Sequence, residues 1–206
     1  MEKGADINIE GEFKETPLFN ACKWGNEDIV KYLVEKGADI NKENRWAETP
    51  LFSACRWGNE DIVKYLVEKG ADINKRNSND RTPLFFAFEK GHENLIKYLV
   101  RKGADINKEI NEKNIFGDTL LIIATKSKKL NLIKYLIEHG ADVNLSNKYH
   151  STPLTIAREC GEKDIVDYLL QHGAKDNDGD SSLKMAGEHD FTVLKNFYFD
   201  LLNMDE

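Results

Sequence analysis

The sequence predicts an all-α protein, a solenoid of stacked helix-turn-helix units joined by β-hairpin-like fingers. Residues 16–41 and 49–74 are identical except at two positions. The same pattern starts again at three further threonines, Thr82, Thr119 and Thr152. Counted from Thr16, the starting threonines are 33, 33, 37 and 33 residues apart. A fixed period of this length indicates stacked copies of one supersecondary unit.

The first helix of each unit is predicted from its start, its apolar face and its end. Thr16 fits an N-cap, and Pro17 fits the first helical position because its missing N–H needs no partner there. Three apolar residues at helical spacing then share one face: Leu18, Ala21 and Cys22. Gly25 is predicted to end this short helix.

The second helix follows at once. Asn26 fits its N-cap, and two acidic residues in the first turn suit the positive end of the helix dipole. Four apolar residues form its stripe: Ile29, Val30, Leu33 and Val34. Gly37 is predicted as the left-handed stop. The polar stretch before the next threonine is predicted to be a finger, and the four extra residues between Asn107 and Thr119 predict one longer finger, exposed as a surface loop.

The repeated signature T-P-L-x-x-A-x-x-x-G, I-V-x-x-L, G-A-D-I-N resembles the ankyrin repeat, over about residues 4–175. The family usually has His two residues after the Pro, and this slot instead holds Phe19, Phe52, Phe85, Ile122 and Thr155. The resemblance therefore implies that apolar contacts replace the family's Thr–His hydrogen bonding. In the fourth repeat Leu120 replaces Pro and Lys128 replaces Gly, so we expect that repeat to be the least regular.

We expect a single ankyrin-repeat domain over residues 1–206. Its parts are a trailing half-repeat (1–10), repeats at 11–43, 44–76, 77–113 (with the extended finger), 114–146 and 147–180, and a degenerate C-terminal cap (181–206). The opening MEKGADIN matches only the close of a repeat. This favours a fragment of a longer array over a first helix pair exposed on one side. For the last 26 residues, the alternative to a cap is a solvated tail helix.

Composition narrows the class of protein. The chain of 206 residues has net charge −7 and 40% hydrophobic residues, without an apolar run of membrane-spanning length or a secretory leader. Three cysteines without a disulfide framework predict a reducing, cytoplasmic location. The acidic balance argues against nucleic acid as the main partner. We expect a monomer without a membrane partner.

Candidate chemical sites are weak, so the sequence predicts no enzyme, no cofactor and no metal. His139 and His172 are one repeat apart, too far for one metal ion. The alternating Asp176, Asp178 and Asp180 lack the later glycine and glutamate of a calcium loop. Cys160 has no orienting partner set for a nucleophile. A short basic cluster is interpreted as a solvated loop: Lys126, Lys128 and Lys129.

The variable slots of the repeat lie on the predicted finger tips and at the end of each first helix. All three tryptophans occupy such slots: Trp24, Trp46 and Trp57. Exposed Trp and Arg are enriched in the hot spots of protein interfaces. The alternative is that Trp24 and Trp57, one repeat apart, only pack on each other and on the fingers.

The preferred hypothesis is a non-catalytic protein-interaction module with an unidentified protein partner. In the ankyrin family partners commonly meet the finger tips and the first helices, which implies a concave site in repeats 1–3: Phe13, Glu15, Trp24, Arg45, Trp46, Glu48, Arg56, Trp57 and Arg81. Two alternatives stay open, a targeting or scaffold fragment of a larger enzyme or effector and an inert, consensus-like array. The family's terminal Asn slot is a known hydroxylation target, and we interpret it first as fixing the finger turn: Asn41, Asn74, Asn107 and Asn144.

Overall fold

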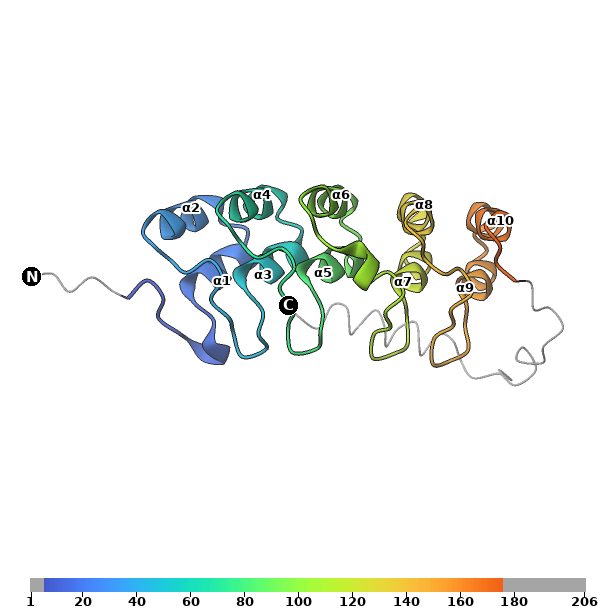
Figure 1. Cartoon of the computed structure of the whole chain (residues 1–206), viewed down its shortest axis with the longest axis horizontal. Helices are drawn as coiled ribbons and strands as arrows, with labels where there is room; N and C mark the ends of the chain where they lie inside the picture. The colour runs from blue at the N-terminus through green and yellow to red at the C-terminus, as the bar shows by residue number, and fades with distance from the viewer. Residues whose placement is uncertain (1–5, 176–206) are drawn as a thin grey trace, which may run out of the picture. The chain divides into compact units, whose positions relative to one another are not determined.

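The computed structural model describes residues 6–175, which fold as five stacked helix pairs (Figure 1). The first helices form one row: α1 (Pro17–Lys23), α3 (Pro50–Trp57), α5 (Pro83–Glu89), α7 (Leu120–Lys126) and α9 (Pro153–Glu159). The second helices form the other: α2 (Glu27–Glu35), α4 (Glu60–Glu68), α6 (Glu93–Arg101), α8 (Leu130–Glu138) and α10 (Lys163–Gln171). Fingers extend from the row of first helices. Since this part of the chain contains no strand, the predicted all-α solenoid is confirmed. The fingers are turns, and the first of them includes a short 3-10 helix, η1 (Glu12–Lys14).

The core lies between neighbouring pairs and is built from the predicted repeated positions. Leu18, Cys22 and Val30 are buried, as are their counterparts one repeat later. The prediction is wrong for Ile29, whose side chain is 47% exposed while its counterpart Ile62 is 2% exposed. The pair α1 and α2 precedes the pair that contains Ile62, whereas no described helix pair precedes that of Ile29, which lines a hollow at this end. The same residue type is thus core inside the array and surface at its N-terminal end.

The predicted capping is confirmed at some helix starts and wrong at others. The side chains of Thr119 and Thr152 cap α7 and α9, and Thr152 bonds with Thr155. Asn26 caps α2 as predicted, with its side chain accepting a hydrogen bond from the N–H of Ile29. Thr16 stands at the N-cap of α1, but its side chain makes no capping bond, and its hydroxyl is buried without a partner in the described structure, as is that of Thr49. Phe19 and Phe52 fill the adjacent space and are fully buried. Apolar packing therefore replaces polar bonding at these starts.

The fourth repeat is more regular than expected. Helices α7 and α8 have 7 and 9 residues, the lengths found in the first and third repeats. The turn between them keeps the backbone shape of the other repeats, because Lys128 adopts φ +56°, in the region that Gly25 and Gly91 occupy elsewhere. A side chain in this left-handed region costs conformational energy that glycine does not pay. The fourth repeat therefore departs from the others through backbone strain at Lys128, not through a change of shape.

Replacing Lys128 with Gly is expected to raise the free energy of unfolding by about 1 kcal/mol, because the strain disappears. The substitution also removes an ion pair with Glu162, but that pair is exposed and contributes little. Urea denaturation of both proteins measures the difference. Ser127→Gly is the matched control: Ser127 has φ −82°, so glycine there should destabilise the protein. Equal effects of the two substitutions would contradict the strain argument.

A row of asparagines links each unit to the next. Asn41 accepts a hydrogen bond from the N–H of Asp72 (2.9 Å) and donates one to the carbonyl of Gly70 (3.2 Å). Asn74 does the same one repeat later. In the third repeat this position is taken by Asn111, which accepts from the N–H of Asp142 (2.9 Å). The assignment of Asn107 to this slot was therefore wrong.

Because Asn111 is the linking asparagine, the four extra residues of the third repeat lie before it and not in the finger that follows. These residues lie next to a 3-10 turn at Ile106–Lys108. Ile106 in this turn and the following Glu109 and Ile110 are buried. The insertion is thus not the exposed surface loop that was expected, because half of it is packed. The described helices belong to one compact unit that ends at Ala174. The predicted C-terminal cap at 181–206 lies outside the described residues.

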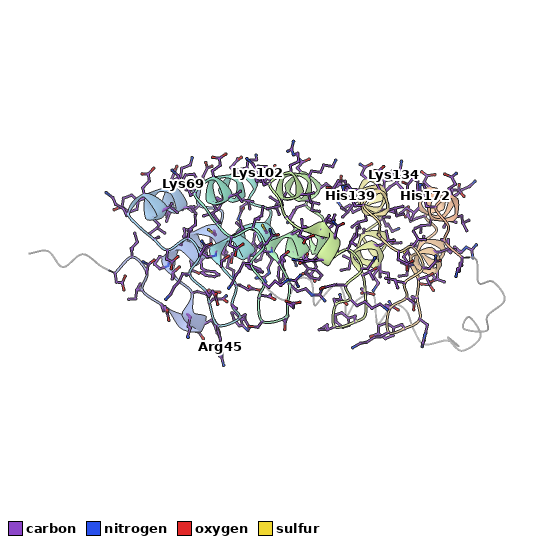
Figure 2. All side chains as sticks on the ribbon, viewed as in Figure 1. Arg45, Lys69, Lys102, Lys134, His139 and His172 are labelled. Atoms are coloured by element: carbon purple, nitrogen blue, oxygen red, sulfur yellow. The ribbon has the colours of Figure 1, made fainter. Side chains whose placement is uncertain are left out.

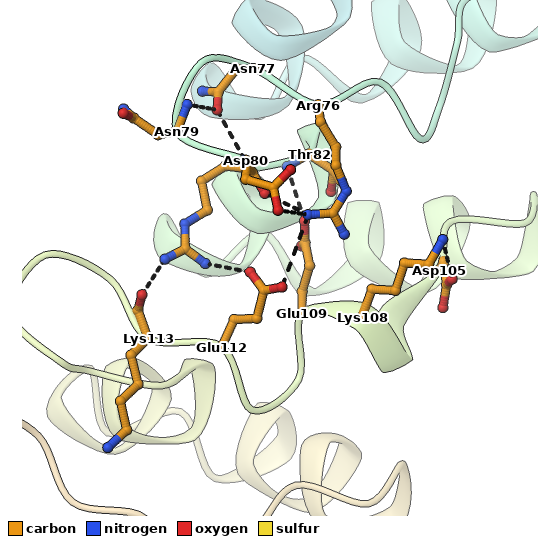
Figure 3. Close-up of polar contacts among 11 residues, drawn as sticks. Arg76, Asn77, Asn79, Asp80, Thr82, Asp105, Lys108, Glu109, Glu112 and Lys113 are labelled. Atoms are coloured by element: carbon orange, nitrogen blue, oxygen red, sulfur yellow. Dashed lines mark hydrogen bonds and ion pairs between the residues drawn. The ribbon is translucent and has the colours of Figure 1, made fainter.

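Two acidic residues in and just after the insertion, Glu109 and Glu112, contact the base of the third finger (Figure 3). The residue before the starting threonine is Glu48 in the second repeat but Arg81 in the third. Arg81 pairs with Glu112 (3.2 Å) and donates to the carbonyl of Lys113. Glu109 accepts a hydrogen bond from the N–H of Thr82 (2.9 Å). The charge reversal at residue 81 is therefore compensated by Glu112, which follows the linking Asn111, while the inserted Glu109 binds the backbone of Thr82.

Glu109 makes stability depend on pH. Its second carboxylate oxygen is buried without a partner among the described residues. Burial raises the pKa of Glu109 above its usual range, although hydrogen bonds from Thr82 and the charge of Arg76 oppose the rise. A carboxyl group whose pKa is higher in the folded state weakens the fold above that pKa, and this penalty fades as pH falls towards the unfolded-state pKa.

We expect Glu109→Gln to stabilise the protein at pH 7, because it removes a buried charge. The advantage over the wild type should shrink as pH falls through the raised pKa of the wild-type carboxyl group, which then takes up its proton. Urea denaturation at several pH values measures both effects. Glu112→Gln is the contrasting variant, since it breaks the ion pair with Arg81 and should destabilise. A pH-independent advantage for Glu109→Gln would contradict this account.

Candidate functional site

Each finger from the second onward is shaped by an asparagine at its base. Asn44 accepts hydrogen bonds from the N–H groups of Trp46 (2.9 Å) and Glu48 (3.0 Å), which folds the loop so that residue 46 lies at its tip. Three other asparagines make the same pair of bonds: Asn77, Asn114 and Asn147. These four asparagines were not among the residues predicted for the site. Their signal is an asparagine five residues before the starting threonine in four repeats.

Neighbouring fingers are joined through their backbones. The N–H of Arg45 donates to the carbonyl of Phe13 (2.8 Å), and the N–H of Ser78 donates to that of Trp46 (2.8 Å). Lys148 donates to Phe116 in the same way (3.1 Å). Across residues 6–175, no equivalent bond joins the third and fourth fingers, where the insertion begins. The finger tips therefore form two backbone-linked groups, fingers 1–3 and fingers 4–5.

The first two finger tips carry an exposed aromatic pair. The rings of Phe13 and Trp46 lie 5.2 Å apart between centroids, and the two residues are 42% and 43% exposed. Arg45 is exposed beside them at the finger edge (Figure 2). Trp46 is held by its backbone on both sides, through Asn44 and Ser78. The pair is thus presented to solvent on a positioned loop.

The acidic residue at the base of the second finger faces inward. Glu48 is buried and accepts hydrogen bonds from Arg56 (2.8 Å) and from the side chain of Asn77 (3.0 Å). We expected Glu48 to orient a partner, but its carboxylate is directed at these two side chains. Glu48 therefore positions Arg56 and the third finger. Glu15, its counterpart in the first repeat, is half-buried.

At the ends of α1 and α3, a basic side chain lies over aromatic rings. Lys23 lies within 6 Å of two indole rings, 5.5 Å from the centre of Trp24 and 5.9 Å from that of Trp57. The guanidinium of Arg56 lies 4.2 Å from the ring centre of Phe86. Such contacts are favourable between a cation and the face of an aromatic ring. Trp57 is exposed, so this cluster continues the surface beside the second finger.

Arg81 and Trp24 differ from the other predicted site residues. The side chain of Arg81 is largely buried, stacks on Phe85 (4.4 Å) and pairs with Glu112, so it supports the third finger from inside. Trp24 is 77% exposed and lines a shallow hollow together with Ile9, Pro17 and Ile29 at the N-terminal end of the described helices. Trp24 thus faces the end of the array as well as Lys23.

The remaining candidates make structural contacts. His139 and His172 stack on Tyr135 and Tyr168, with ring centroids 4.1 and 4.0 Å apart, in the row of second helices away from Arg45 (Figure 2). Within residues 6–175 there is no cluster of three or more metal-binding side chains.

Two lysines of the short basic cluster form ion pairs: Lys126 with Asp118 and Lys128 with Glu162. Cys160 is exposed. The aspartates proposed for a calcium loop, residues 176–180, lie outside the described residues.

No helix in the described part of the chain has the length and apolar character needed to cross a membrane. The comparison with curated proteins finds no matching sequence. A family model described as ankyrin repeats (3 copies) matches residues 1–77, 43–110 and 107–180. Such repeats generally serve as protein–protein interaction modules and are typically non-catalytic. Together with the stacked helix pairs and their fingers, this match shows that the chain belongs to the ankyrin repeat family.

Proposed function

We propose that this protein is a non-catalytic interaction module that binds a protein partner along its finger tips and the ends of its first helices, the concave side of repeats 1–3. One observation carries the proposal: Phe13 and Trp46 form an exposed aromatic pair on backbone-linked fingers, with Arg45 beside them. Exposed aromatic and arginine side chains are the residue types that dominate interface energetics.

The fingers favour binding because they are ordered before a partner arrives. Asn44 fixes the loop that carries Trp46, and Glu48 ties this loop to Arg56 on α3 and to Asn77 in the next finger. Binding to a loop already in its final conformation loses less conformational entropy than binding to a mobile one. The partner would therefore contact Trp46, Arg45 and Trp57 on a surface that needs little rearrangement.

The other predicted residues have different parts in this proposal. Glu48 and Arg81 act from inside by holding the fingers, and Glu15 occupies the same slot in the first repeat. Trp24 would contact the partner only at the edge of the surface, because it lines the N-terminal hollow.

We also propose a monomer in the cytoplasm. Cys22 and Cys55 are buried in adjacent repeats, where burial raises the pKa of each thiol far above its usual range. Such thiols pack as small apolar side chains and are poorly reactive, and they need no oxidising compartment.

A pull-down from the source organism tests the interaction. We expect the wild-type protein to retain a specific partner and the Trp46/Trp57 double alanine variant to lose it, because both anchors are removed. Tyr32→Ala is the matched control, since Tyr32 is an aromatic on α2, in the other helix row, and is even more exposed than Trp46 and Trp57. Loss of the partner in the control as well would indicate non-specific adhesion.

The two alternatives make different predictions. If the module is a targeting or scaffold part of a larger enzyme or effector, the full-length coding region should contain a catalytic segment. If the array is inert, no partner should be retained by the wild-type protein and lost by the double variant.

A further inference from the structure

The fourth and fifth fingers repeat the arrangement of the first and second. Ile115 is 76% exposed and Tyr149 is 57% exposed, so these fingers also present apolar side chains to solvent. The N–H of Lys148 donates to the carbonyl of Phe116, as that of Arg45 donates to that of Phe13. In both finger pairs a backbone hydrogen bond thus joins a phenylalanine to a basic residue of the next finger. A large aromatic residue follows that basic residue in the sequence, Trp46 in one pair and Tyr149 in the other.

We call these two sets half-sites. The first half-site consists of Phe13, Arg45 and Trp46, and the second of Ile115, Phe116, Lys148 and Tyr149. The site predicted from the sequence lies only in repeats 1–3, because all three tryptophans belong to that part of the chain. The structure shows that the exposed apolar row resumes beyond the third finger.

The third finger separates the half-sites with polar residues. Its tip carries Ser78, Asn79 and Asp80, all exposed, and Asp80 is paired with Arg76 (2.6 Å). An apolar anchor would gain nothing by covering these groups, because burying them without hydrogen bonds costs free energy. A ligand that occupies both half-sites therefore needs a polar stretch over the third finger.

The exposed charges of the finger tips are mostly positive, although the chain has net charge −7. Lys14, Arg45 and Lys148 are exposed, and none of them is in an ion pair in the described structure. Glu12 is the matching exposed acidic residue, and Asp80 is neutralised by Arg76. This imbalance favours an acidic ligand, because opposite charges assist encounter and orientation.

We propose that the two half-sites bind one extended, acidic peptide segment of a partner protein, which carries two apolar anchors joined by a polar stretch. The half-sites are three repeats apart. At about 8–10 Å per stacked helix this is roughly 25–30 Å. An extended chain advances about 3.3 Å per residue, so the two anchors are expected about eight or nine residues apart. This inference rests on the proposed function and specifies its ligand.

A phage-displayed library of random peptides of about 20 residues, long enough to span both half-sites, tests the proposal with the full chain as bait. Enriched peptides should be acidic and contain two apolar anchors at the expected spacing. Synthetic versions should bind about tenfold or more weakly to Trp46→Ala and, separately, to Tyr149→Ala. Affinity should also fall when salt rises from about 0.05 M to about 0.3 M. Tyr32→Ala should bind as the wild type does, and circular dichroism should show that every variant is folded.

The other results separate this inference from the proposed function. Peptides that depend on Trp46 but tolerate Tyr149→Ala, or that keep their affinity when the polar stretch is shortened by about four residues, would overturn the two-anchor ligand and leave the interaction module standing. Enrichment of basic peptides would overturn the acidic ligand. Absence of enrichment, or binding that tolerates both variants, would count against both proposals.

Discussion

Replacing Asp118 with Ala is expected to lower the free energy of unfolding by about 3 kcal/mol. Asp118 is buried at the base of the fourth finger, where one carboxylate oxygen is 2.7 Å from the ammonium of Lys126 and the other accepts a hydrogen bond from Asn147 (2.9 Å). Alanine leaves the buried amide of Asn147 without this acceptor and removes the carboxylate that pairs with Lys126. Breaking a buried pair on one side costs more than removing both groups.

Urea denaturation monitored by circular dichroism measures this loss. Ser151→Ala is the matched control, because Ser151 occupies the same slot in the fifth repeat and contributes its backbone, through bonds with Asn147. That control should change stability by about 0.5 kcal/mol or less. A loss as small as this for Asp118→Ala would show that the acidic slot does not hold the fingers together, and would weaken the positioning role assigned to Glu48.

The helices could be predicted because the information is local and repeated. Apolar spacing, the prolines at the starts of the first helices and the glycines at the ends recur in phase, so each copy supports the assignment of the others. The exception is Ile29, which has the sequence context of Ile62 but not its neighbours. Burial in a solenoid depends on what packs against each face, and that differs at the end of an array.

The linking asparagine of the third repeat could not be predicted from local sequence. Asn107 and Asn111 both follow an isoleucine, so the pattern fits either residue. The hydrogen bond from the N–H of Asp142 selects Asn111, and this contact joins residues that are 31 positions apart. Sequence spacing alone does not show which of two equivalent side chains reaches the next repeat.

The burial of the residues at the finger bases could not be predicted from local sequence either. Glu48 is a charged residue next to a predicted finger tip, and it was therefore assigned to the surface. Its burial depends on two polar partners, Arg56 at the end of α3 and Asn77 in the next repeat. Buried charges are tolerated where such partners exist, and those partners come from the fold.

The tryptophan slots were correctly predicted to be exposed, but exposure alone does not separate binding from incidental packing. Trp46 offers the sharpest test. Its ring contacts that of Phe13, while its backbone is held by Asn44 and Ser78 in a way that alanine preserves. The side chain can therefore be removed without disturbing the finger.

Trp46→Ala is expected to weaken partner binding by about 2 kcal/mol or more, as truncation of a hot-spot aromatic does. The same change should lower the free energy of unfolding by only about 0.5 kcal/mol, because the residue lies outside the core. Calorimetric titration with the captured partner and urea denaturation measure the two quantities. Tryptophan emission of the free protein should be red-shifted and open to a soluble quencher, and part of it should become protected when the partner is added. A loss of several kcal/mol in stability would instead make Trp46 a packing residue and remove the main anchor of the proposed interface.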